Sequence, residues 1–216
     1  AISCGLLALG IDVSSFPRPL SLANMAYPLS SDRSIALLKE YVRNSGITIM
    51  LCLLFVVFYL AIMLYLPEQR QSIIESLGVK DHLDYGLLTA VFVHARFQHI
   101  MGNSIGILGL GAWLENNSSK TRYLISIFVC TIGAWLFYIL RSPEKVAIGS
   151  SGLVYGLAGM FLSSQFKALS VIFFLLGVLW LGYVWIQPIP TGQDVHAAGY
   201  FFGCLINIIW VAVKKK

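Results

Sequence analysis

The chain has 216 residues, of which 57% are hydrophobic and only 12% are charged, and its formal net charge is +5. Soluble domains usually carry about 25% charged residues, so this composition excludes an ordinary soluble protein and indicates one polytopic membrane domain. The positive charges lie mainly in short loops and in the terminal residues Lys214, Lys215 and Lys216. This distribution is typical of charges that orient a membrane protein, so we expect no nucleic-acid partner.

Residues 1–44 are expected to form a cytoplasmic lead-in that is partly irregular. The segment 13–32 is rich in serine and proline, which favour loops. The first dozen residues are apolar, but they are too short to cross a bilayer and lack a positively charged start. No function is assigned to this region.

Apolar segments of about 20 residues predict spanning helices. Six such segments follow, at 45–66, 87–114, 123–140, 146–166, 169–186 and 195–213. They predict an all-α bundle over 45–213, followed by a basic cytoplasmic tail at 214–216. The positive-inside rule places both termini in the cytoplasm, with nine lysines and arginines on that side against five on the other. The polar connection 67–86 is long, and residues 71–77 within it are expected to form a short amphipathic helix at the membrane interface.

The cysteines carry no sign of metal binding. They are scattered along the chain, without a CxxC pair or a Cys/His cluster of metal-binding spacing: Cys4, Cys52, Cys130 and Cys204. Buried free thiols behave as small hydrophobes, so we predict neither a metal nor a cofactor.

The fourth predicted span contains two serines among glycines. Residues 149–152 read Gly-Ser-Ser-Gly, and Gly152, Gly156 and Gly159 lie on one helical face. Gly-xxx-Gly spacing allows close approach of another helix. A serine at a helix start also lies beside unpaired backbone N–H groups, which can stabilise an oxyanion. Alternatively, these serines are packing residues and helix caps.

The sixth predicted span carries His196, with Gly199 and Gly203 on the same helical face. An ionisable side chain within a span is costly and therefore indicates function. If this face packs on the glycines of the fourth span, His196 comes within hydrogen-bonding distance of Ser151, as nucleophilic catalysis requires. The alternative is a core histidine that bonds to a backbone carbonyl.

The second predicted span carries His99 and Asn103, one helical turn apart and on one face. Their N–H groups would converge as oxyanion donors. Alternatively, Asn103 bonds across to a neighbouring helix. Tight packing is expected where glycines gather on this face, at Gly102, Gly106 and Gly109.

Taken in order, these motifs resemble those of the rhomboid intramembrane serine proteases of the minimal six-span bacterial type. The resemblance covers about residues 45–213. It rests on His-xxx-Asn at 99–103, Gly-xxx-Glu at 111–115, Gly-x-Ser-Gly at 149–152 and His-Ala-Ala-Gly at 196–199. Four ordered motifs make this resemblance specific, and it implies a six-helix rhomboid-like bundle.

The resemblance implies a role for four polar side chains. Ser151 would be the nucleophile and His196 the general base of a dyad. His99 and Asn103 would form the oxyanion hole with the backbone N–H of Ser151. Residues that it implies pack around the site are Gly149, Gly152, Tyr155 and Gly199.

The sequence departs from the family in the first external loop. Relatives often carry a Trp-Arg pair shortly before the second span, where residues 85–89 here read Tyr-Gly-Leu-Leu-Thr. We therefore expect this loop to be anchored differently. Asp194 lies two residues before His196 and points away from it on a helix, so we expect a loop-end charge and no triad. His94 and Arg96 are expected at the membrane interface, and His82 in the loop.

The resemblance implies hydrolysis of peptide bonds in or near transmembrane segments, by an integral protein of the bacterial inner membrane. Single-span membrane proteins are the expected substrates and membrane lipids the expected surroundings, while the oligomeric state stays open. One alternative is a catalytically inactive relative that binds transmembrane helices, which the presence of Ser151 and His196 disfavours. A transporter is disfavoured because no Asp or Glu lies well inside a predicted span.

Overall fold

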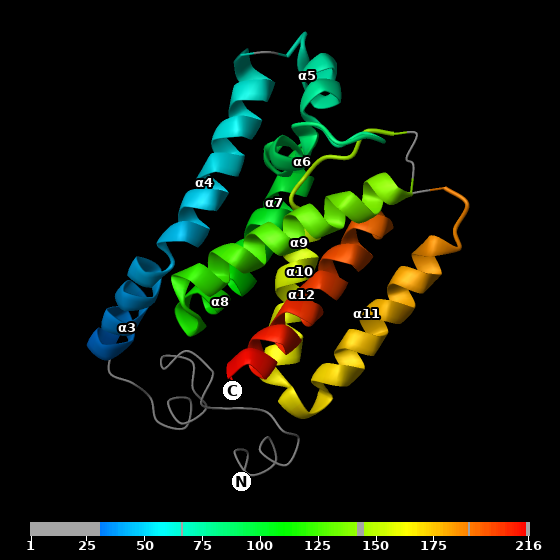
Figure 1. Ribbon diagram of the computed structural model, residues 1–216. Helices are drawn as coiled ribbons and strands as arrows, with labels where there is room; N and C mark the ends of the chain where they lie inside the picture. Colours follow the sequence, from blue (N-terminus) through cyan, green and yellow to red (C-terminus); the bar gives the residue numbers. More distant parts are fainter. Residues whose placement is uncertain (1–30, 66, 142–144, 190, 215–216) are drawn as a thin grey trace.

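The computed structural model describes residues 31–65, 67–141, 145–189 and 191–214, and this part of the chain is helical apart from loops and one isolated β-bridge (Figure 1). The α-helices are α3 (Ser31–Asn44), α4 (Gly46–Leu60), α5 (Arg70–Leu77), α6 (Gly86–Thr89), α7 (Phe97–Gly106), α8 (Ala112–Asn117), α9 (Lys120–Leu140), α10 (Ser151–Gln165), α11 (Ser170–Trp185) and α12 (Gly192–Lys214). Shorter turns of other helix types are η3 (Ala61–Tyr65), η4 (Ala90–Phe92), η5 (Ile107–Gly111) and η6 (Lys167–Leu169).

Four helical stretches of the described chain are long and apolar enough to cross a membrane: Gly46–Leu64, Lys120–Leu140, Lys167–Trp185 and Gly192–Val213. They correspond to the first, third, fifth and sixth predicted spans. Their outer surfaces are apolar, and α11 exposes Val171, Ile172 and Leu179. Lipid accommodates such a surface whereas water does not, so the chain is an integral membrane protein.

The second and fourth predicted spans differ from the structure. The helical run at the second begins at Phe97 and continues through α7, η5 and α8 to Asn117, because Arg96 has an extended backbone (φ −140°, ψ 145°). At the fourth, α10 has 15 residues and begins at Ser151, because the preceding Gly149 has a positive φ of 102°. Both starts lie C-terminal to the predicted ones, and the count of six spans stays a prediction.

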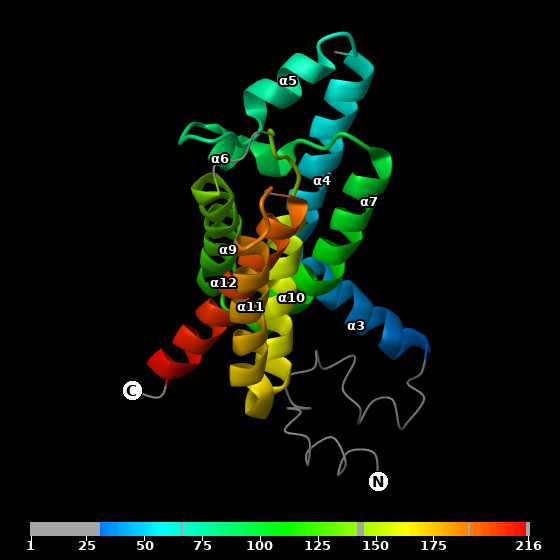
Figure 2. The ribbon, with the colours of Figure 1, turned by 90° about the vertical axis from the view of Figure 1, so that its right-hand side faces the viewer.

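Helix α10 lies in the middle of the bundle and contacts α7, α9, α11 and α12 (Figure 2). Its contact with α12 is made backbone to backbone. A Cβ atom at Gly199 would overlap the carbonyl oxygen of Gly152, and one at Gly203 would overlap that of Gly156. The two helices therefore approach as closely as the spacing of their glycines predicts.

The glycines of the second predicted span do not behave alike. A Cβ at Gly106 would lie 2.7 Å from Cγ1 of Val154 on α10, so the helices pack tightly there. Cβ atoms at Gly102 and Gly109 would meet nothing within 4 Å. The expectation of tight packing along this whole face was wrong, because only Gly106 faces α10.

At the end of the bundle opposite Ser151, a buried carboxylate joins α8 to α4. Glu115 at the end of α8 accepts hydrogen bonds from the backbone N–H groups of Ile47 (3.0 Å) and Thr48 (2.8 Å), in the first turn of α4. Lys120 donates to the same carboxylate over 2.5 Å. Burial by itself would raise the pKa of Glu115, but the hydrogen bonds from Lys120 and Thr48 outweigh it and lower the pKa. A carboxylate at a helix N-terminus is also favoured by the helix dipole.

The loop 67–96, which leads to α7, contains the helix predicted at 71–77, which the structure has as α5 (Arg70–Leu77). The loop is anchored without a Trp-Arg pair. The guanidinium of Arg70 donates to the carbonyl of Ala95, and the Thr89 hydroxyl donates to the carbonyl of Leu77 over 2.7 Å. Val79 and Ala147 exchange two backbone hydrogen bonds of 2.9 Å, which tie the loop to the segment that leads into α10.

Candidate active site

Ser151 is the first residue of α10 and follows a sharp turn at Gly149. Two observations require glycine at 149. Its φ of 102° is one that other residues rarely adopt, and an added Cβ would lie 2.5 Å from Cε1 of His99. The N–H of Gly149 donates to the carbonyl of Ala90 over 2.8 Å, which fixes the turn against the loop 67–96. The turn thus presents Ser151 at the end of the central helix, with His99 packed against it.

His196 lies against the same end of α10. Its ring stacks on that of Tyr155, with the centroids 4.3 Å apart and the planes at 20°. Tyr155 is one helical turn after Ser151 and shares its face. The neighbouring residues are in contact as well, since a Cβ at Gly152 would lie 2.7 Å from Cγ1 of Val195. His196 therefore faces the side of α10 that carries Ser151.

The imidazole of His196 has an unused nitrogen. Its Nδ1 is buried and has no hydrogen-bond partner among the described residues, and none of their hydrogen bonds joins His196 to Ser151. Both residues are partly exposed, so a third molecule can reach them. Catalytic hydrogen bonds are often absent from the free enzyme and form only with substrate. The His196 ring, which faces the side of α10 that carries Ser151, thus keeps a nitrogen with unused hydrogen-bonding capacity, and an imidazole can both donate and accept protons.

His94 lies in the protein core of this region, and its position relative to the membrane interface stays a prediction. Its side chain is fully buried, because the chain turns inward before α7. Its Nε2 is 3.0 Å from Nδ2 of Asn103 and 3.3 Å from the hydroxyl of Ser150. The His99 ring lies edge-on to it, 5.1 Å away. A histidine directly after the apolar run 90–93 was the available sequence signal, since burying such a group is costly.

The start of α10 thus lies between two sets of polar side chains. His94, His99 and Asn103 lie on the side of α7, whereas His196 lies on α12. The first N–H groups of α10 have no partner within the helix and are available between the two sets. This arrangement can surround a carbonyl group with donors on one side and a base on the other. Among the described residues, no group of three or more His, Cys, Asp or Glu side chains is arranged to hold a metal ion.

The partners of the Asp194 carboxylate are Arg141 and Thr191. The carboxylate is 2.9 Å from Nε of Arg141 and accepts from the N–H of Thr191 over 2.6 Å. Arg141 also donates to the carbonyls of Trp185 (2.7 Å) and Gln187 (2.5 Å). The expectation that Asp194 does not form a triad agrees with this geometry. Asp194 is nevertheless only 1% exposed, so it is a buried ion-pair partner that joins three helix ends and is no solvated loop charge.

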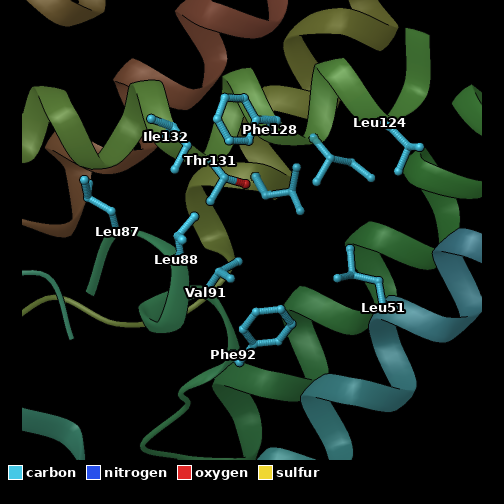
Figure 3. A pocket seen from close by; sticks show the side chains of 11 residues that line it. Leu51, Leu87, Leu88, Val91, Phe92, Leu124, Phe128, Thr131 and Ile132 are labelled. Atoms are coloured by element: carbon cyan, nitrogen blue, oxygen red, sulfur yellow. The ribbon is translucent and has the colours of Figure 1, made fainter. Parts of the chain in front are cut away.

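An apolar cavity of about 290 Å³ lies on another side of the molecule (Figure 3). Leu88, Val91 and Phe92 of the loop 67–96 face Leu51 of α4 and Phe128 of α9 across it. Thr131 supplies the single polar side chain of the described lining. This cavity contains no nucleophile and no base, so the candidate active site is the turn at Gly149 and the start of α10.

The fold and this site define an all-α integral membrane protein with serine and histidine side chains gathered at one end of a central helix. Residues 83–214 match the family described as Rhomboid domain, and the chain belongs to this family. It is 24% identical to RHOMBOID-like protein 1 of Arabidopsis thaliana over 67% of this chain and 39% of the relative. It is 30% identical to RHOMBOID-like protein 5 of the same plant over 45% of this chain and 33% of the relative.

A relative from a parasite carries the word protease in its name. Rhomboid-like protease 3 of Toxoplasma gondii is 25% identical over 60% of this chain and 51% of the relative. The chain thus spans between a third and about half of the length of these relatives. The matches concern the membrane domain and leave the remainder of each relative uncompared.

Proposed function

We propose that the protein is an intramembrane serine endopeptidase that hydrolyses peptide bonds in or near transmembrane segments by a dyad of Ser151 and His196. The observation that carries this proposal is the stacking of His196 on Tyr155, at 4.3 Å, one turn beyond Ser151 on the same helix face. Membership of the rhomboid family supports it, as does the printed name of one relative, Rhomboid-like protease 3.

In the proposed reaction, His196 takes the proton of the Ser151 hydroxyl as the oxygen attacks the scissile carbonyl. His99, Asn103 and the N–H of Ser151 stabilise the oxyanion of the tetrahedral intermediate. His196 then returns the proton to the leaving amine, and water releases the acyl-enzyme. The partial exposure of Ser151 and His196 supports access of substrate and water.

We further propose single-span membrane proteins as substrates. A helical carbonyl is shielded by its own hydrogen bond, so substrates with helix-destabilising residues near the outer membrane face would be cleaved best. With both termini in the cytoplasm, the start of α10 would lie on the outer side of a bacterial inner membrane.

The experiment is labelling of the purified protein with a fluorophosphonate serine probe, combined with cleavage of a single-span substrate panel. Ser151→Ala should abolish labelling, and His196→Ala should lower the cleavage rate by at least about 10⁴-fold with nearly unchanged thermal stability. Ser150→Ala is the matched control, since its hydroxyl is one residue away and faces His94. It should retain labelling.

Two outcomes would contradict the proposal. Equal labelling of the wild type and Ser151→Ala would show that Ser151 is not the nucleophile. A folded wild type that neither reacts with the probe nor cleaves any substrate would favour an inactive rhomboid-like protein that binds transmembrane helices.

A further inference from the structure

A second cavity, of about 330 Å³, lies at the end of the bundle opposite Ser151. It is formed where α8 ends, α9 begins, α10 ends and α12 passes. The 15 residues of α10 separate this end from Ser151 by about 22 Å, at 1.5 Å per residue. Its polar lining includes Asn117, Ser118, Arg122, Ser164, Lys167 and Asn207.

The lining of this cavity is basic. Arg122 and Lys167 both contribute to it, and the described lining contains no aspartate or glutamate. Arg122 is held in position because its Nη2 donates to Oδ1 of Asn207 over 2.7 Å and its guanidinium lies 5.8 Å from the Trp210 ring centroid. The described lining therefore brings a fixed guanidinium and a lysine to one cavity.

Two buried donors among the lining residues have no acceptor. Nε of Arg122 and Nε1 of Trp113 are both buried, and neither has a hydrogen-bond partner among the described residues. Buried N–H groups are paired in most proteins, so two unpaired donors beside a basic cavity give this end of the bundle more donors than acceptors. A phosphate group supplies negative charge and several acceptor oxygens at once.

We propose that this cavity binds a phosphate group, carried either by an anionic phospholipid headgroup or by free phosphate. The lipid source fits the position of the cavity among helix ends, where basic pockets of membrane proteins take up headgroups. In the proposed orientation this end faces the cytoplasm. The site is separate from the proposed protease chemistry and does not depend on it.

The experiment is native mass spectrometry of the full-length protein in neutral detergent. Separate arms contain phosphatidylglycerol, phosphatidylcholine and inorganic phosphate. The wild type should retain phosphatidylglycerol, and retention should fall by about tenfold in Arg122→Gln and in Lys167→Gln. Lys167 is exposed, so its replacement leaves the packing intact. Lys145→Gln is the matched control because Lys145 is also exposed but precedes α10 at the other end.

The arms separate the two sources of phosphate. Selective retention of phosphatidylglycerol supports the lipid headgroup, whereas retention of inorganic phosphate with the same dependence on Arg122 and Lys167 supports the free anion. Equal retention of phosphatidylglycerol by the wild type and both cavity variants would overturn the proposal. Loss of retention in Lys145→Gln to the same degree would overturn it as well, since it would indicate attraction by net charge alone.

Discussion

Two helix contacts at opposite ends of the bundle are built from different chemistry. At the end near Ser151, α10 and α12 meet through the backbones of Gly152 and Gly199, with no side chain between them. At the other end, α4 and α8 are joined by the carboxylate of Glu115, which accepts the N–H groups of Ile47 and Thr48. The first contact depends on shape and the second on charge-assisted hydrogen bonds.

The two contacts meet different structural requirements. A backbone contact leaves little freedom in the relative position of two helices, which suits a site that must hold His196 over α10. A carboxylate instead satisfies helix N–H groups that have no partner within their own helix. We therefore expect substitutions at the glycine contact to affect activity and stability together. Substitutions at the carboxylate should affect stability first.

The largest effect on stability is expected from Glu115→Ala. This change leaves the backbone N–H groups of Ile47 and Thr48 without their acceptor, and each buried donor left unpaired costs about 1–3 kcal/mol. Thermal unfolding in detergent measures the loss. An unchanged unfolding temperature would show that the carboxylate is not a structural link.

The pH dependence of protein stability provides a second test of the Glu115 carboxylate. The folded-state pKa of Glu115 is lowered, so its contribution to stability is complete above the unfolded-state value of about 4.3 and is lost as the pH falls through the folded-state pKa. The wild type should therefore lose stability in acid relative to Glu115→Gln, whose side chain does not titrate. If the wild type and Glu115→Gln lost the same stability as the pH falls, the lowered pKa of Glu115 would be contradicted.

The next largest effect is expected from Gly203→Ala. The added methyl group overlaps the carbonyl oxygen of Gly156, which is backbone and cannot move aside, and overpacking of this kind costs about 1–3 kcal/mol. Cleavage should fall as well, because α12 carries His196. The matched control is Gly102→Ala, where the new methyl group meets nothing within 4 Å and the stability should be kept or slightly raised.

The smallest effect is expected from His94→Leu. Asn103 and Ser150 lose a shared partner inside the core, and leaving buried polar groups unpaired costs about 1–3 kcal/mol, partly offset here by the apolar side chain. His94 acts on the site through its neighbours, so kcat should fall while KM for a single-span substrate changes little. A variant with wild-type kcat would show that His94 serves packing alone.

Much of the fold follows from patterns that are local in sequence. Hydropathy predicted four of the spans, and α5 was expected from its mixed polarity. The spacing of Gly152 and Gly156 against Gly199 and Gly203 predicted the close approach of α10 and α12, because small residues at helical spacing have few other reasons to recur.

The structure differs from the predictions where contacts between segments distant in sequence determine the backbone conformation. The segment that leads to the start of α10 is held by the bridge between Val79 and Ala147, whose partners are far apart in sequence. The guanidinium of Arg70 donates to the carbonyl of Ala95 across the loop, and no sequence pattern within either segment predicts that contact. The contacts of His94 were not predicted for the same reason, since its partners Asn103 and Ser150 belong to two other segments.

The bridge between Val79 and Ala147 has a mechanical consequence. Both of its hydrogen bonds join short irregular segments, and Gly149 follows two residues later. The bridge thus couples the position of the loop 67–96 to the first turn of α10 through the backbone. A peptide or antibody fragment that binds this loop would displace Ser151 without contacting it.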